Sequence, residues 1–116
     1  MSPPSPDSPV REIRWVDQTA VVHVVGDVDL SRSTEFQQSL LALMDRKPER
    51  IVVDLAGVEY MDSSGVASLV KLLSRSRKAG AQLSLVGLGE RVRSIFEITR
   101  LDTVFDIFAT IEEAMA

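Results

Sequence analysis

The sequence contains no cysteine and only one histidine, His23. The absence of cysteine excludes disulfide bonds, thiolate zinc sites and a cysteine nucleophile. A metal site of clustered histidines, or a relay of two histidines, would require a second chain. With 116 residues, the chain suits a single domain that buries roughly 65% of the surface its unfolded form exposes. A hydrophobic core can therefore hold the fold without covalent cross-links.

Positive charge and long apolar runs are also scarce. The chain has 13 Lys and Arg residues against 17 Asp and Glu residues, which gives a net charge of −4. A nucleic-acid-binding protein needs a basic face for phosphate contacts, so this balance argues against a nucleic-acid partner. Apolar runs such as Ala20–Val22, continued after His23 by Val24 and Val25, are far shorter than the roughly 20 residues that cross a bilayer. We therefore expect no insertion into a membrane.

The first nine residues offer little that a core could bury. Four of the five prolines lie in Met1–Pro9, where they are interleaved with serines. Pro/Ser-rich segments of this kind lack apolar side chains, so we predict a disordered tail over residues 1–9. The same segment lacks the basic and apolar regions of a targeting signal, which favours a cytoplasmic protein.

Two strands are predicted after the tail. In Val10–Val16, Ile13 and Trp15 alternate with charged residues, the period-two pattern of a strand with one wet face. Ala20–Val25 is almost uniformly β-branched and apolar, which is typical of a strand covered on both faces. The short polar link between them predicts an antiparallel hairpin.

A helix and a third strand are predicted next. Ser31–Arg46 carries apolar side chains at the spacing of one helical face, and Pro48 ends the helix. Ile51–Leu55 has the composition of another buried strand. Because a crossover of helical length joins the two buried strands, we expect them to run parallel.

The second half of the chain alternates helices with strands. Apolar residues at helical spacing, followed by Gly80 at the position of a helix-ending glycine, predict a helix over Ser64–Ala79. The elements predicted after it are a strand at Gln82–Val86, a helix from Glu90, a strand at Val104–Phe108, and a helix through Met115 opened by a capping box of Thr110 and Glu113. This order indicates one α/β domain over residues 10–116 with a mixed, mostly parallel sheet.

The stretch Asp54–Val66 runs from the end of a buried strand through a loop into the start of a helix. Carboxyl ends of strands and N-termini of helices are where sheets of this class meet ligands and partners. Asp62 or Ser63 would serve there as an ordinary N-cap. Alternatively, the Ser63 hydroxyl, at the positive end of the helix dipole, would be a phosphorylation site.

This junction is similar to a motif of a known family. Tyr60-Met61-Asp62-Ser63-Ser64-Gly65-Val66 resembles the Asp-Ser-(Ser/Thr)-Gly phosphorylation motif of the STAS domain, specifically of the stand-alone bacterial anti-sigma factor antagonists. Val25-Gly26-Asp27-Val28-Asp29 is similar to the Gly-Glu-Leu-Asp that follows the family's second strand. Further similar segments stand in family order at Val52–Leu55, Lys78–Leu83, Arg91–Phe96 and Leu101–Phe105. The resemblance covers nearly everything outside the tail. One departure is Val66-Ala67, where family members often have Leu-Gly.

The resemblance implies a fold of about four or five strands and about four helices, and a protein-binding module controlled by phosphorylation. In that family an anti-sigma factor serine kinase phosphorylates the Ser directly after the motif Asp, which implies Ser63, with Ser64 as the runner-up. The unphosphorylated protein binds the anti-sigma factor and releases the sigma factor, and a serine phosphatase resets the switch. The implied partner-binding residues are Asp27, Asp62, Ser63, Ser64, Gly65 and Val66.

A second function also fits the resemblance. STAS domains serve as subunits or regulatory modules of membrane transporters, including lipid-transport ABC complexes. The helix after Asp62 would then dock statically, and Ser63 would be only a cap.

No pattern in the sequence favours an enzyme, a cofactor or a metal ion. The glycines after Val86 lack the third glycine of a dinucleotide-binding motif, so ordinary turns are favoured. Aspartates 27, 29, 54 and 62 could approach one another, but Asp is also a common cap and turn residue, so we expect no metal site. His23, inside a valine-rich strand, is expected to be structural. No nucleophile is paired with a base, so we expect no catalysis.

Overall fold

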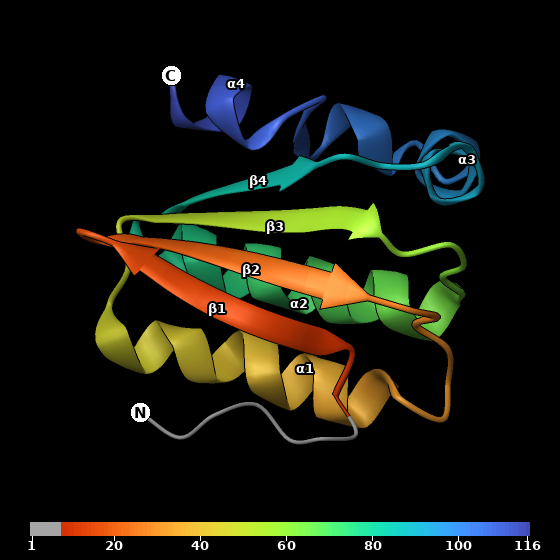
Figure 1. The fold of residues 1–116 in the computed structure, drawn as a ribbon, viewed down its shortest axis with the longest axis horizontal. Helices are drawn as coiled ribbons and strands as arrows, with labels where there is room; N and C mark the ends of the chain where they lie inside the picture. The colour runs from red at the N-terminus through yellow and green to blue at the C-terminus, as the bar shows by residue number, and fades with distance from the viewer. Residues whose placement is uncertain (1–7) are drawn as a thin grey trace.

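The computed structural model describes residues 8–116 and contains a five-stranded sheet with helices on both of its faces (Figure 1). In chain order the elements are β1 (Val10–Val16), β2 (Thr19–Val25), α1 (Ser33–Ala42), a 3-10 helix (Leu43–Arg46), β3 (Arg50–Gly57), α2 (Ser63–Ala79), β4 (Gln82–Val86), α3 (Glu90–Ile98), a second 3-10 helix (Leu101–Thr103), β5 (Asp106–Phe108) and α4 (Ile111–Met115). The α/β class predicted from the sequence is confirmed.

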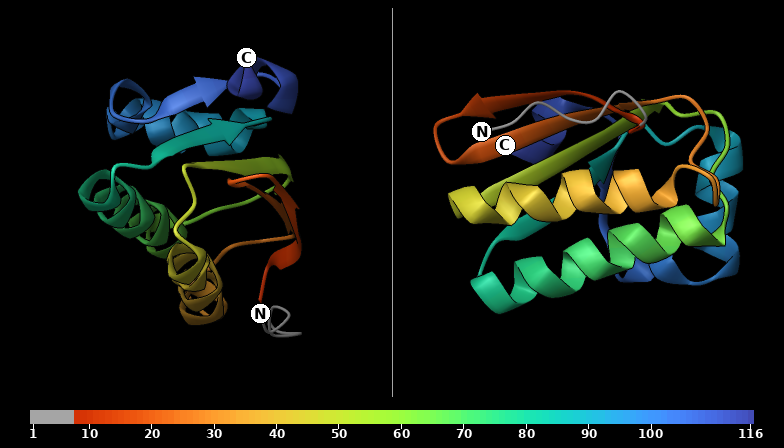
Figure 2. Two further views of the ribbon diagram at one scale, coloured as in Figure 1. Left: turned by 90° about the vertical axis from the view of Figure 1, so that its left-hand side faces the viewer. Right: turned by 90° about the horizontal axis from the view of Figure 1, so that it is seen from below.

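Each strand of the sheet lies next to its neighbour in sequence, because the order is β1-β2-β3-β4-β5. β1 and β2 pair antiparallel as a hairpin, and the other pairs are parallel, as predicted. Helices α1 and α2 lie side by side against one face of the sheet (Figure 2). Both helices begin at the end of the molecule where β2 and β3 finish, so two strand-to-helix loops meet there.

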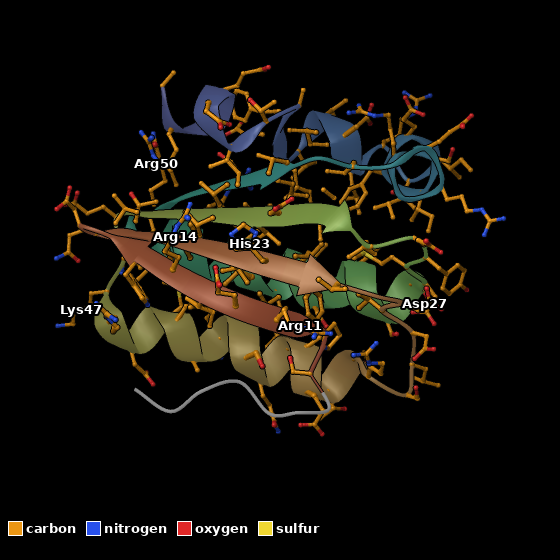
Figure 3. All side chains as sticks on the ribbon, viewed as in Figure 1. Arg11, Arg14, His23, Asp27, Lys47 and Arg50 are labelled. Atoms are coloured by element: carbon orange, nitrogen blue, oxygen red, sulfur yellow. The ribbon has the colours of Figure 1, made fainter. Side chains whose placement is uncertain are left out.

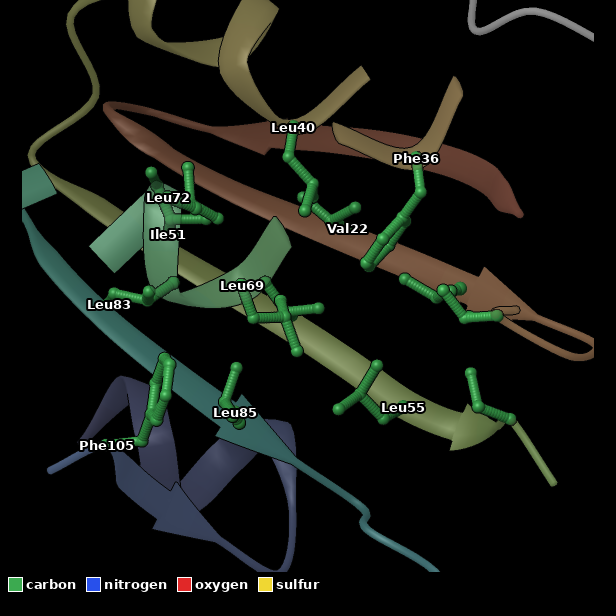
Figure 4. Packing of buried hydrophobic residues seen from close by; sticks show 14 of the residues in the cluster. Val22, Phe36, Leu40, Ile51, Leu55, Leu69, Leu72, Leu83, Leu85 and Phe105 are labelled. Carbon is green, nitrogen blue, oxygen red and sulfur yellow. The ribbon is translucent and has the colours of Figure 1, made fainter. Parts of the chain in front are cut away.

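The main core lies between the sheet and helices α1 and α2 (Figure 4). Ile51 and Leu55 of β3 face this core together with Leu40 of α1 and Leu69 of α2, and all four are fully buried. Burying a large aliphatic side chain stabilises a fold by about 1.5–3 kcal/mol. The central strands and the two helices therefore form a rigid base for the loops at their ends.

A smaller cluster covers part of the opposite face of the sheet. Val52 of β3 and Val86 of β4 pack there against Ala114 of α4. Successive residues of β3 thus face two different cores, which explains why this strand is apolar at consecutive positions instead of alternating.

The helix predicted over residues 31–46 begins two residues later than expected. Asp29 Oδ1 accepts hydrogen bonds from the backbone N–H (3.1 Å) and the hydroxyl (2.6 Å) of Ser31, which holds these residues in a turn. The last part of the helix tightens into the 3-10 segment and ends at Lys47, whose φ of 51° is left-handed. This turn shapes the loop between β2 and α1.

The last predicted strand, residues 104–108, is shorter than expected and begins at Asp106. The backbone N–H of Phe105 donates to the carbonyl of Leu101 in a helical turn (3.0 Å), so residues 104 and 105 are not extended. The final helix starts as predicted: Thr110 Oγ1 accepts the N–H of Glu113 at 3.2 Å.

Two residues of the predicted tail belong with the folded domain. Ser8 is 7% exposed, and its hydroxyl oxygen accepts hydrogen bonds from the Val10 N–H (3.1 Å) and the Ser39 hydroxyl (2.8 Å). The Pro9 carbonyl accepts the Val25 N–H at 2.9 Å. Ser8 and Pro9 therefore pack with the folded domain, although their composition placed them in the predicted tail. The rest of the predicted tail, residues 1–7, lies outside the described residues.

Charged residues mark the two ends of the sheet. Asp27 lies beyond the carboxyl end of β2, while Lys47 and Arg50 lie at the opposite end, near the start of β3 (Figure 3). Across residues 8–116, no helix combines the length and the apolar content needed to span a membrane.

Candidate functional site

Two loops are joined by hydrogen bonds at the carboxyl end of the sheet. Between β2 and α1, the N–H of Val28 donates to the carbonyl of Tyr60 (2.9 Å), and the carbonyl of Val28 accepts the N–H of Asp62 (3.1 Å). Val28 and Met61 form an isolated parallel bridge, and both are fully buried. The loop before α1 and the loop before α2 therefore form one surface.

Asp62 caps α2 and also holds the neighbouring loop. Its Oδ1 accepts the backbone N–H of Ser64 at 2.9 Å and of Gly65 at 3.4 Å, while its Oδ2 accepts the N–H of Leu30 at 3.1 Å. The Ser64 hydroxyl also donates to Oδ1. This hydroxyl, and then the backbone N–H groups, hold the pKa of the Asp62 carboxyl below its ordinary value, although partial burial opposes them. Asp62 is thus the N-cap of α2, as one of the two sequence predictions, Asp62 or Ser63, had it.

The two serines after Asp62 differ in environment. Ser63 is the first residue of α2, its side chain is exposed, and no hydrogen bond ties its hydroxyl to another described residue. The Ser64 hydroxyl, by contrast, is held by the Asp62 carboxylate. A phosphoryl donor can therefore approach the Ser63 oxygen directly, while Ser64 would first have to leave the cap.

Gly65 allows the start of α2 to pack closely against the other loop. A Cβ at this position would lie 2.8 Å from Met61 Cγ and from Val28 Cγ1, and 3.0 Å from the Val28 carbonyl oxygen. Such contacts are shorter than van der Waals packing allows, so the absence of a side chain is required here. Gly65 shapes the site without forming its outer surface.

Val66 does not form that surface either. Its side chain is 6% exposed and belongs to the main core. The family resemblance implies Val66 as a partner-binding residue, but its side chain packs in the core between α2 and the sheet. Of the predicted binding residues, Asp27 and Ser63 are exposed and Asp62 and Ser64 are partly exposed.

Two apolar side chains beside the motif are exposed. Leu30, between β2 and α1, is 75% exposed, and Tyr60, before α2, is 44% exposed. Leu30 is not among the predicted site residues. The signal that could have singled it out is a leucine between Asp29 and Ser31.

The four aspartates considered for a metal site have other partners or lie apart. Asp54 Oδ2 pairs with His23 Nδ1 at 2.8 Å across β2 and β3, and its Oδ1 accepts the Ala56 N–H at 3.0 Å. Asp62 is engaged in the cap. No group of three or more potential ligands suitable for a metal ion occurs within residues 8–116. His23 serves as a cross-strand partner on the face of the sheet away from α1 and α2.

The Asp62 cap makes a testable contribution to stability. Asp62→Ala is expected to lower the free energy of unfolding by about 0.5–2 kcal/mol at pH 7. Because the folded-state pKa of Asp62 lies below its ordinary value of 3.8, the ionised cap stabilises the fold above that pH. The difference between wild type and Asp62→Ala should therefore shrink as the pH falls through the folded-state pKa. Urea unfolding at a series of pH values measures it.

Asp62→Asn is the matched control, because Asn also caps helices but does not ionise in this range. It should retain most of the stability at pH 7, while its difference from wild type should change with acid pH. If wild type and Asp62→Asn showed the same pH dependence, the carboxylate of Asp62 would not be the titrating cap.

Comparison with known protein families matches residues 11–114 to the STAS domain. The anti-sigma-B factor antagonist of Bacillus subtilis (strain 168) is 31% identical over 101 residues, which are 87% of this chain and 92% of the relative. The crystal structure of an anti-sigma factor antagonist from Mycobacterium paratuberculosis is similar with a TM-score of 0.85 and 27% identity, covering 96% of this chain and 94% of that one. A sulfate transporter family protein from Wolinella succinogenes has a TM-score of 0.74 at 16% identity, covering 85% and 83%, which shows a shared fold alone.

Proposed function

The chain belongs to the STAS domain family, and from this premise we propose that it is an anti-sigma factor antagonist whose binding is switched by phosphorylation of Ser63. The observation that carries the proposal is the exposed Ser63 hydroxyl at the start of α2, next to a Ser64 hydroxyl that the Asp62 cap holds. The names of the relatives in Bacillus subtilis and Mycobacterium paratuberculosis support the same function. They describe regulatory proteins that act on another protein.

In the proposed cycle, the unmodified chain binds an anti-sigma factor and releases the sigma factor. The anti-sigma factor is also a serine kinase, which transfers the γ-phosphoryl group of ATP to Ser63 Oγ. The new O–P bond replaces the bond between the γ-phosphorus and the bridging oxygen, ADP leaves, and the hydroxyl proton passes to a base on the kinase or to solvent. This chain contributes the exposed hydroxyl and the surface around it. A serine phosphatase removes the phosphate, and all of these proteins act in the cytoplasm.

The charge of the phosphate explains how one group can end binding without unfolding the domain. Phosphorylation adds about −1.5 to −2 charge at neutral pH. The start of α2 favours a negative charge by about 0.3–1 kcal/mol, so the fold tolerates it. A partner that covers Ser63 would have to bury this charge beside the Asp62 carboxylate. A loss of only about 3 kcal/mol in the complex would weaken binding more than a hundredfold.

The transporter alternative has no specific support in the structure, because the similarity to the sulfate transporter family protein extends to the fold alone. Partner capture separates the two functions. Immobilised wild-type chain is expected to retain an anti-sigma factor of the serine kinase type from a lysate of the source organism, identified by mass spectrometry. Ser63→Asp should retain at least tenfold less. Retention of transporter subunits equally by both forms would contradict the proposal.

A further inference from the structure

Leu30 is an exposed apolar side chain on an ordered loop. Its exposure is 75%, and its backbone N–H is bound to Asp62 Oδ2 at 3.1 Å. Its carbonyl accepts the hydroxyl of Ser33 at 3.2 Å, and the Asp29–Ser31 turn fixes the residues on either side. A side chain presented from a fixed backbone loses little conformational freedom when a partner covers it. The backbone of Leu30 is therefore already ordered before a partner binds, and its side chain is exposed for contact.

The location of Leu30 links it to the phosphorylation surface. Asp62, the residue before Ser63, accepts the Leu30 N–H with one carboxylate oxygen and caps α2 with the other. The carboxylate that holds Leu30 therefore also caps the helix whose first residue is Ser63. Tyr60, 44% exposed, adds a second apolar side chain to this surface. Leu30 and Ser63 therefore lie on the surface that the two joined loops form.

The two joined loops are mainly acidic. Asp27 and Glu59 are exposed on them, and Asp29 directly precedes Leu30. The one basic residue between β2 and α1, Arg32, donates from Nη1 to the Asp27 carbonyl at 3.2 Å. An excess of negative charge around an apolar contact favours a partner surface of the opposite sign. The complementary surface is therefore an apolar pocket with basic residues at its edge.

We propose that Leu30 is the apolar anchor of this surface, and that its side chain enters a hydrophobic pocket with a basic border on the anti-sigma factor that phosphorylates Ser63. This inference rests on the proposed function and identifies how the partner recognises the chain. Leu30 determines affinity without taking part in phosphoryl transfer. In the proposed cycle, a phosphate that separates the partner from Ser63 also withdraws Leu30 from its pocket.

The test measures binding of purified chain variants to the anti-sigma factor retained in the capture experiment, by calorimetry. Leu30→Ala is expected to weaken binding by about tenfold or more, because a buried leucine side chain contributes enough to shift affinity by that factor. Leu30→Met, which keeps the volume, should stay within about threefold of wild type. The melting temperature should not change in either variant, because Leu30 is outside the core.

Val16→Ala is the matched control. Val16 is 44% exposed and pairs with Thr19 at the start of β2, the opposite end of the sheet from Leu30. It should bind as tightly as wild type. Wild-type affinity should fall as ionic strength rises, because the proposed border is basic.

The outcomes separate the inference from the proposed function. If wild type binds an anti-sigma factor but Leu30→Ala binds equally well, Leu30 is not an anchor and the proposed function stands. Affinity that does not change with ionic strength would overturn the basic border. If wild type retains no anti-sigma factor, the proposed function fails, and the inference fails with it.

Discussion

A Ser63→Ala chain should accept no phosphate from ATP and the anti-sigma factor, whereas wild type should accept one. In the structure Ser63 is exposed at the start of α2 and its hydroxyl has no partner among the described residues, so it can enter a kinase site without rearrangement. Intact mass spectrometry after incubation measures the added phosphate, and peptide mapping assigns its position. The expected change is complete loss of modification in the variant.

Ser64→Ala is the matched control, because it removes a hydroxyl one residue away. This variant should still gain one phosphate at Ser63. It loses the hydrogen bond from the Ser64 hydroxyl to Asp62, so its free energy of unfolding should fall by about 0.5–1.5 kcal/mol. A phosphate found on Ser64 of the wild type would show that Ser64, and not Ser63, is the phosphorylated residue. An unmodified wild type, despite tight binding to the anti-sigma factor, would rule out the phosphorylation switch.

The fold could be predicted from the sequence because its main signals are local. Apolar spacing identified the helices that pack on the sheet, and Gly80, with a φ of 75°, ends α2 where a helix-ending glycine was expected. The helical crossover between β2 and β3 fixed their parallel pairing. These features depend on neighbouring residues and on simple connection rules, so a single sequence is enough to define them.

The details of the site depend on contacts between residues far apart in the sequence. No local pattern indicates that the Asp62 carboxylate reaches the N–H of Leu30, 32 positions away. The burial of Val66 follows from the orientation of α2 against the sheet. The sequence of the motif alone does not give this orientation. Ser8 was assigned to a tail by composition, but its partner Ser39 lies 31 positions further on. The motif indicates a candidate site, and the structure gives the contacts around it.

Leu69→Ala should separate the scaffold from the binding surface. Leu69 is on the same helix as Ser63, but its side chain is fully buried and points toward the sheet (Figure 4). Removing three carbon atoms there leaves a cavity that the packed strands cannot close, so we expect a loss of about 2–5 kcal/mol in the free energy of unfolding. Urea unfolding at neutral pH measures the loss. Because domains of this size are stable by only about 5–15 kcal/mol, part of the population could unfold near physiological temperature.

Val70→Ala controls for the loss of an aliphatic side chain on the same helix. Val70 is 40% exposed, so its truncation should change the free energy of unfolding by only about 0.5 kcal/mol.

Ser63→Asp provides the opposite contrast. A carboxylate at the start of α2 interacts favourably with the helix dipole, so the melting temperature should not change, while affinity for the anti-sigma factor should fall at least about tenfold. If Ser63→Asp unfolded the domain, the Ser63 hydroxyl would be structural. If Leu69→Ala cost no more than Val70→Ala, the start of α2 would not rest on the packed core described above, and the rigidity of the binding surface would need another source.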